Sequence, residues 1–159
     1  MLESILDDFS AHGSLPVAVA VVRLLGAALM AACIGFEREL KDHPAGLRTH
    51  MLVALASAMF AVLAVEIVSS PVFAVDQARI DPLRIIQAVT SGVALLAAGV
   101  VVFFRGRIQG VTTGAGIWLA SSIGLATGFG FWPIAFAATI IGIIVLILLR
   151  RFEKAMSLK

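Results

Sequence analysis

Five apolar runs follow one another along the chain, and short polar connections separate them. They cover residues 16–36, 50–68, 85–104, 111–127 and 131–149. A helix needs about 20 apolar residues to cross a hydrocarbon core about 30 Å thick, and four runs meet that length closely. The run at 111–127 is shorter and rich in Gly, Ser and Thr, whereas the last run, with TIIGIIVLILL at its centre, is the strongest.

The absence of alternation in these runs favours helices over barrel strands. In lipid, backbone polar groups must be satisfied within the protein, so spanning segments are helices or closed barrels. Barrel strands alternate polar and apolar residues over about 10 positions, which these runs do not do. We therefore predict an all-α, polytopic membrane protein with a bundle of about five transmembrane helices. A short segment at 1–15 precedes the transmembrane domain at 16–150, and a basic tail at 151–159 follows it.

Composition supports a membrane protein. The chain has 159 residues, of which 60% are hydrophobic and 14% charged, against about 45–50% and about 25% in soluble domains. The net charge of +2 is too small to indicate nucleic acid as a partner. The N-terminal MLESILDDFSAHG is acidic, so we expect no cleavable signal peptide. Cys33 is the one cysteine, which excludes a disulfide within the chain, and we expect it to be a small packing residue.

The basic residues predict the direction of the spans. With five spans, one side of the membrane carries nine Lys and Arg residues and the other side two, Arg79 and Arg84, while Arg23 lies within the first span. Cytoplasmic loops carry the excess of Lys and Arg. We therefore expect the N-terminus outside and the C-terminus in the cytoplasm. The nine are Arg38, Lys41, Arg48, Arg105, Arg107, Arg150, Arg151, Lys154 and Lys159.

Ionisable residues concentrate between the first two runs, in GFERELKDHPAGLRTHMLV at 35–53. Lys and Arg suffice to fix topology, so the acidic residues need another explanation. Glu37 ends the first run and Arg48 precedes the second, and opposite charges there can pair across the two helix ends. Such a pair breaks even only with good geometry and further hydrogen bonds. A solvated loop is the alternative. His43 and His50 are too few and too far apart for a transition-metal site, although either can titrate near neutrality.

Further charged residues lie near the outer ends of the spans. Arg23 is either a snorkelling anchor or a member of an ion pair, with Asp76, Asp81 and the acidic N-terminus on its side. Asp81 before Pro82 is typical of a helix N-cap.

Glycines at four-residue spacing concentrate after residue 90: Gly106, Gly110 and Gly114, then Gly124 and Gly128. Small residues at this spacing let membrane helices approach closely. Packing within the bundle is the favoured interpretation, and a surface for a partner helix or for self-association is the alternative. Thr112 and Thr113 lie among these glycines, and a broken helix lining a polar site is a further alternative.

Several motifs together resemble the MgtC/SapB family of bacterial inner-membrane proteins. These are GFEREL, AGLRTHMLV, DPLRI, SGVALLAAGVV and GVTTGAGIWLASSIGLATGFG, and the resemblance covers about residues 23–151. Ala94 and Ala97 stand where the family has glycines, Gln87 is shifted from the family's glutamine position, and GVTTGAG replaces the family's GL[TN]TAA. The soluble C-terminal domain of some members is not expected here.

The resemblance implies a multi-pass protein of the bacterial inner membrane. It implies a regulator of other membrane proteins, including the membrane sector of F-type ATP synthase, linked to magnesium limitation and survival in phagocytes. A transporter or channel for Mg²⁺ or another cation is the alternative, with Mg²⁺ then as its cargo. No phosphate-binding loop, nucleophile elbow or H-E-x-x-H motif is present, so we expect no enzyme, catalytic residue, cofactor or resident metal. The expected functional residues are Glu37, Arg38, Glu39, Arg48, Thr49, Arg84, Thr112 and Thr113.

Overall fold

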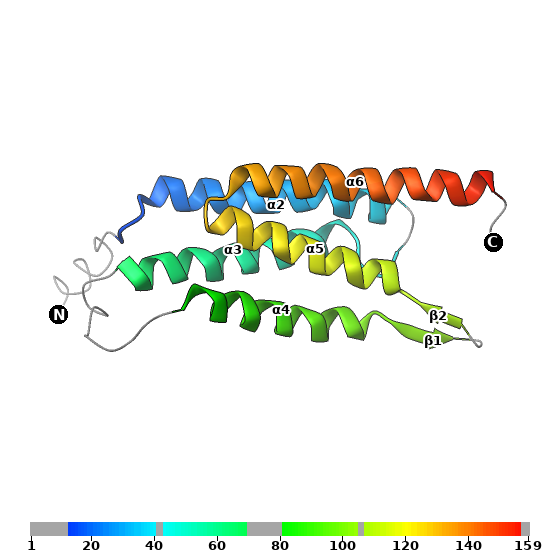
Figure 1. Cartoon of the computed structure of the whole chain (residues 1–159), viewed down its shortest axis with the longest axis horizontal. Helices are drawn as coiled ribbons and strands as arrows, with labels where there is room; N and C mark the ends of the chain where they lie inside the picture. The colour runs from blue at the N-terminus through cyan, green and yellow to red at the C-terminus, as the bar shows by residue number, and fades with distance from the viewer. Residues whose placement is uncertain (1–12, 41–42, 70–80, 105–106, 157–159) are drawn as a thin grey trace.

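The computed structural model describes residues 13–40, 43–69, 81–104 and 107–156. Five helices and one two-stranded hairpin form this part of the chain (Figure 1). All five expected helices are therefore confirmed. The elements are α2 (Val17–Glu39), α3 (Leu47–Ser69), α4 (Pro82–Gly99), β1 (Val102–Phe104), β2 (Arg107–Gln109), α5 (Val111–Gly128) and α6 (Trp132–Ala155).

Two of the helices are long and apolar enough to cross a membrane by themselves. These are α2 and α3, each with a mean hydropathy of 2.4 over its most apolar window. The shorter apolar stretches are Leu83–Gly99 in α4 and Trp132–Leu148 in α6. The expected segment at 1–15 and the tail at 151–159 lie largely outside the residues whose side chains are described, as do Asp76 and Gly106.

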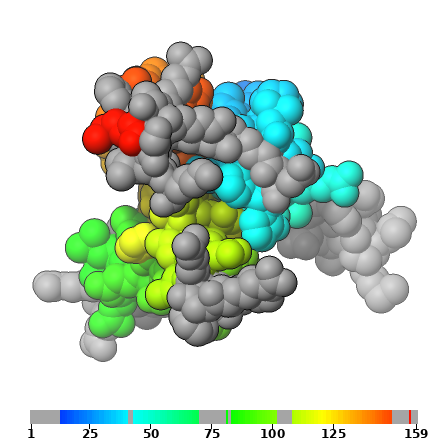
Figure 2. Space-filling view, turned by 90° about the vertical axis from the view of Figure 1, so that its right-hand side faces the viewer, coloured from blue at the N-terminus to red at the C-terminus, as the bar shows by residue number. Residues whose placement is uncertain are grey.

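α5 is the centre of the bundle although its run is the shortest of the five and rich in Gly, Ser and Thr. It contacts α2, α3, α4 and α6, and eleven of its 18 residues are buried. Seen from the end of the bundle, α6 and α4 lie on opposite sides of the molecule (Figure 2). The small residues that weaken α5 as a hydrophobic signal are what allow four helices to approach it.

The contact between α3 and α5 depends on small residues facing each other. A Cβ at Gly124 would collide with the Ala54 carbonyl oxygen, and one at Gly128 would lie 2.5 Å from that of Ala58. Ala54 and Ala58 are themselves fully buried. The structure thus places both glycines against α3 inside the bundle.

The third helix ends earlier than the sequence predicts. The apolar run continues to residue 104, but α4 stops at Gly99 and β1 begins at Val102. β1 pairs antiparallel with β2, with Val102 opposite Gln109. Glycine is common where a helix ends, and the β-branched and aromatic residues after it favour a strand. The expectation of a helix through residue 104 is therefore wrong, whereas the all-α class holds apart from this one short hairpin.

Two glycines occupy the left-handed backbone region at the ends of α5. Gly110 precedes the helix with φ 86°, and a Cβ there would collide with the Val100 carbonyl oxygen. Gly130 follows it, also with φ 86°. Phe131 N–H donates to the Ala126 carbonyl (2.8 Å), which makes this turn a Schellman motif with glycine in its left-handed position. The positions of Gly110 and Gly130 are thus set by the turns at the two ends of α5.

Candidate functional site at the junction of α2 and α3

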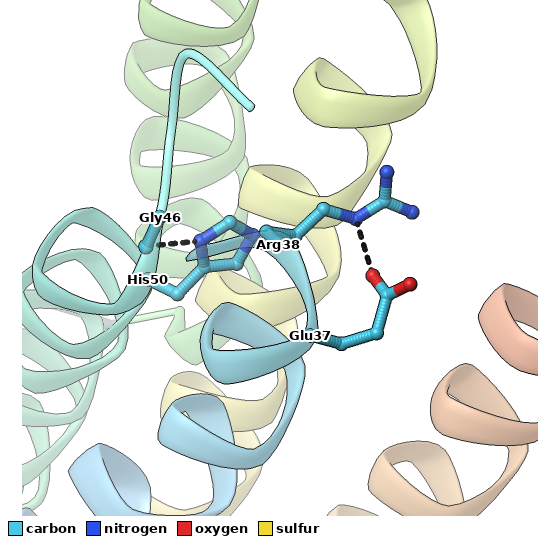
Figure 3. Close-up of polar contacts among 4 residues, drawn as sticks. All are labelled: Glu37, Arg38, Gly46 and His50. Atoms are coloured by element: carbon cyan, nitrogen blue, oxygen red, sulfur yellow. Dashed lines mark hydrogen bonds and ion pairs between the residues drawn. The ribbon is translucent and has the colours of Figure 1, made fainter. Parts of the chain in front are cut away.

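A buried arginine marks the end of α2 (Figure 3). Arg38 is 5% exposed, and its Nε lies 3.3 Å from the Glu37 carboxylate. The Glu37 side chain is itself only 12% exposed. The pair therefore lies at the helix boundary and out of bulk solvent, as the sequence predicts for Glu37. Its partner is the neighbouring arginine of the same helix.

His50 lies in the first turns of α3 and is completely buried. Its Nδ1 donates to the Gly46 carbonyl (2.8 Å), one turn earlier (Figure 3). Its Nε2 makes no hydrogen bond with any group in the part of the chain that the structure describes. That nitrogen points at α5, where a Cβ on Gly116 would stand 3.0 Å from it. Arg38 is close enough to act on the imidazole electrostatically.

Glu39 closes the connection between the two helices. Its Oε2 accepts the Leu47 backbone N–H (2.9 Å), the first residue of α3. Gly46 lies under the same carboxylate, and a Cβ at this position would collide with it. A carboxylate at a helix N-terminus satisfies a free N–H and faces the positive end of the helix dipole. Glu39 thereby fixes the end of α2 to the start of α3.

The two helices also approach closely at this junction. A Cβ on Gly35 of α2 would lie 2.8 Å from the Cα of Leu47 and 3.0 Å from the Cβ of His50. Gly35 is buried. The GFEREL motif thus contributes a contact glycine, a buried ion pair and a helix cap within five consecutive residues.

The opposite ends of α2 and α3 are joined in the same way. Glu66, near the end of α3, accepts the backbone N–H groups of Ser14 and Leu15, each at 2.7 Å. These residues lead into α2. One carboxylate from each helix therefore binds the chain at the beginning of the other.

Arg23 binds the turn after α5. Its Nη1 donates to the Gly128 carbonyl (2.9 Å), and its guanidinium lies beside Gly130. A cation is favourable at a helix C-terminus because the last carbonyls are unsatisfied and carry the negative end of the dipole. Asp81 was one expected partner of Arg23, but its carboxylate accepts the Leu83 N–H (2.9 Å) as the N-cap of α4, as the sequence predicts.

The remaining expected residues are spread over the bundle. Arg48 is exposed and makes no ion pair within the described ranges, so the expected Glu37–Arg48 pair is not formed. Thr49 is half-buried beside it. Thr112 is exposed on α5, whereas Thr113 is 2% exposed. Gly114 lies against Ala97 of α4. Arg84 is exposed at the start of α4.

Two residues of the junction were missed as site residues. His50 was noted only as a group that titrates, and Gly116 was not singled out. The available signal is a histidine one turn into an apolar helix, because a polar ring at that position needs a partner inside the bundle. Gly116 lies outside the four-residue glycine spacing, so nothing in the sequence marks it as a contact residue of His50.

The chemistry of the junction is that of a closed structural cluster. Each of the four carboxylates whose side chains the structure describes is bound by the protein itself: Glu37, Glu39, Glu66 and Asp81. Among the described residues, no three His, Cys, Asp or Glu side chains gather to hold a metal ion.

The comparison with known proteins decides the family. The MgtC family matches residues 24–155, which contain the α2–α3 junction, most of α2 and all of α3 to α6. The chain belongs to the MgtC family. The resemblance seen in the motifs is confirmed, and with it a bacterial membrane protein.

Three relatives show how far this MgtC-family chain is similar to curated proteins. It is 38% identical over 130 residues to "Protein MgtC" of Salmonella typhimurium (strain LT2), covering 82% of this chain and 52% of the relative. It is 40% identical over 114 residues to "Protein SapB" of Bacillus subtilis (70% and 48%). It is 33% identical over 126 residues to "Putative magnesium transporter YhiD" of Escherichia coli K12 (79% and 58%). The chain thus spans about half the length of these three relatives. No solved structure matches it.

Proposed function

We propose that this MgtC-family protein is a non-catalytic regulator that acts through contacts between its helices and those of other membrane proteins. It lies in the bacterial inner membrane as a multi-pass protein, with its N-terminus outside. The membrane sector of F-type ATP synthase is the partner that the family resemblance implies. Magnesium limitation and survival in phagocytes are the implied conditions of its action.

The observation that carries this proposal is the engagement of the carboxylates. Mg²⁺ prefers oxygen ligands and is usually held by one or two carboxylates together with water. The described carboxylates bind Arg38 or backbone N–H groups. Arg38, the buried charge that acts on His50, is already paired with Glu37. A helical bundle of this kind is suited to binding other helices rather than to conducting Mg²⁺.

Cation transport is the second candidate, and the name of the relative YhiD, "Putative magnesium transporter", favours it. Transport by this chain would require Glu37 and Glu39 to leave their present partners. It would also require several copies to bring these carboxylates together, because one copy offers too few oxygen ligands.

Two measurements on the purified full chain test the proposal. The first is Mg²⁺ uptake into proteoliposomes, followed with an indicator inside the vesicles. We expect no uptake above that of empty liposomes. Uptake that is lost in Glu39→Gln, in protein that is folded and inserted, would establish the transporter and overturn the regulator.

The second measurement concerns the partner. Inverted membrane vesicles that contain F-type ATP synthase acidify when ATP is added, and the chain is co-reconstituted into them. We expect slower ATP-driven acidification with the chain than with an unrelated five-helix membrane protein at equal density. Equal acidification in both preparations would remove this enzyme as the partner.

A further inference from the structure

An open apolar groove of about 700 Å³ runs between α3 and α4. α4 packs mainly on α5 and touches α3 at few points, so the two antiparallel helices leave a space between them. On α3 the lining residues run from Val53 to Ile67, and on α4 from Arg84 to Leu96. Ile67 and Arg84 mark one end of the groove because α3 ends where α4 begins (Figure 1).

Among the lining residues that the structure describes, one is charged, Arg84, and it lies at one end of the groove. Arg84 is exposed, and it makes no ion pair with any other residue that the structure describes. Ser57 also lines the groove, but its hydroxyl is bonded to the Val53 carbonyl (2.9 Å) and to Ser121 (2.8 Å). The remaining lining is aliphatic or aromatic, apart from Gly92. The groove therefore offers one cation and a long apolar channel.

The dimensions of the groove suit a hydrocarbon chain. Fourteen residues separate Val53 from Ile67, which at 1.5 Å per residue gives a length of about 20 Å. A volume of 700 Å³ over that length corresponds to a mean cross-section of about 35 Å². A helix with side chains is about 10–12 Å wide and needs a cross-section of about 80–110 Å². The space between α3 and α4 is therefore wide enough for a hydrocarbon chain, whereas a helix would pack on the open side of the groove rather than within it.

We propose that this groove binds one acyl chain of an anionic phospholipid, whose phosphate is held by Arg84. Guanidinium groups bind phosphate through two parallel hydrogen bonds. Arg84 lies in the first turn of α4, where a span meets the interface. Half of a hydrocarbon core about 30 Å thick is about 15 Å, so a groove about 20 Å long is long enough to hold an acyl chain of one leaflet.

The described carboxylates closest in sequence to this end of the groove do not oppose this binding. Asp81 lies three residues before Arg84, but it is directed at the Leu83 N–H. Glu66 precedes the groove residue Ile67 and binds the Ser14 and Leu15 N–H groups. Arg84 is thus left as the charge that faces a headgroup at this end.

The test uses the full chain, stripped of lipid in detergent and analysed by native mass spectrometry. The probes are phosphatidylglycerol and phosphatidylcholine with identical acyl chains. We expect phosphatidylglycerol to bind several-fold more tightly. Arg84→Gln, which keeps the side-chain length and removes the charge, is expected to bring the two affinities to within a factor of two.

Substitutions at two glycines of α4 provide a matched pair of variants that tests whether lipid occupies the groove. Gly92 lines the groove and Gly99 does not, and a Cβ at either position meets nothing within 4 Å. A Cβ therefore fits at both positions without a collision, and equal unfolding midpoints of the two leucine variants are the control for their folding. Gly92→Leu fills the groove and is expected to weaken both lipids several-fold, whereas Gly99→Leu leaves both affinities unchanged.

Three results would overturn the proposal. The first is equal binding of the two lipids by the unmodified chain. The second is a selectivity that survives Arg84→Gln. The third is a Gly92→Leu variant that binds lipid normally but loses a dimer seen with the unmodified chain, because a second copy would then be the occupant.

Discussion

His50 of α3 faces Gly116 of α5 so closely that a Cβ at position 116 would stand 3.0 Å from the imidazole Nε2. The other ring nitrogen is bonded to the Gly46 carbonyl, so the ring is fixed at Nδ1 while Nε2 faces α5. The connection between α2 and α3 is in this way coupled to the central helix of the bundle.

Substitution of Gly116 tests this contact. Gly116→Val places branched carbons against the imidazole, and overpacking of this kind destabilises by about 1–3 kcal/mol. Thermal unfolding of the detergent-solubilised protein measures the effect, and we expect a lower midpoint. Gly92→Val is the control, because a Cβ there meets nothing within 4 Å. Equal midpoints for the two variants would show that His50 and Gly116 do not restrain each other.

The backbone contact between α3 and α5 predicts a stronger effect of a single methyl group. Gly124→Ala forces its Cβ onto the Ala54 carbonyl, which belongs to the backbone of α3 and cannot rotate away. The gain in helix propensity, about 1 kcal/mol, does not offset this collision. We expect a lower unfolding midpoint than that of the unmodified chain, whereas Gly92→Ala should match or exceed it. A stabilised Gly124→Ala variant would contradict the close approach of the two helices.

Variants of Glu39 and Arg48 distinguish the stability that comes from helix capping from the stability that comes from a surface charge. Glu39→Ala removes the acceptor of the Leu47 N–H, and loss of a cap costs about 0.5–2 kcal/mol. Arg48→Ala removes an exposed charge without an ion pair among the described residues and should change stability by less than about 0.5 kcal/mol. Chemical or thermal unfolding in detergent compares the two. A larger loss of stability in Arg48→Ala than in Glu39→Ala would show that Arg48 stabilises the junction, as the expected pair with Glu37 implies.

Arg38 and Arg48 form a second matched pair, of one buried and one exposed arginine. Arg38→Gln leaves the largely buried Glu37 without the charge of its neighbour, and such a loss destabilises by about 3–5 kcal/mol when the pair is fully buried. We expect a smaller but clear destabilisation here, together with a lower level of the protein in the membrane. Arg48→Gln should leave both quantities unchanged. Equal levels and equal unfolding midpoints would show that Arg38 is not needed to assemble the junction.

The sequence predicted the five helices well because each is a long apolar run between polar breaks. It failed at residues 100–104, where hydrophobicity alone does not distinguish a membrane helix from a strand rich in Val and Phe. It located the α2–α3 junction through its charges but assigned the wrong partner to Glu37. Pairing across helix ends depends on how the helices rotate about their axes, and one sequence does not contain that rotation. The sequence does not predict the contact between His50 and Gly116 for the same reason.

The buried hydroxyl pair between α3 and α5 gives the last prediction. The hydroxyl oxygens of Ser57 and Ser121 lie 2.8 Å apart, and the two residues are 2% and 0% exposed. The Ser57 hydroxyl also lies within hydrogen-bond distance of the Val53 carbonyl, to which it can donate. Hydrogen bonds between membrane helices contribute on average about 0.6 kcal/mol in double-mutant cycles, with a maximum of about 1.7 kcal/mol. Because the Val53 carbonyl offers Ser57 a second partner, we expect a coupling energy near the average between Ser57→Ala and Ser121→Ala.

The cycle requires the free energy of unfolding of four proteins in the same detergent. Ser122→Ala serves as the control, since its exposed hydroxyl is bonded to the Trp118 carbonyl of its own helix and should show no coupling to Ser57. Zero coupling between Ser57 and Ser121 would mean that α3 and α5 are held together by the close contact of their small residues alone.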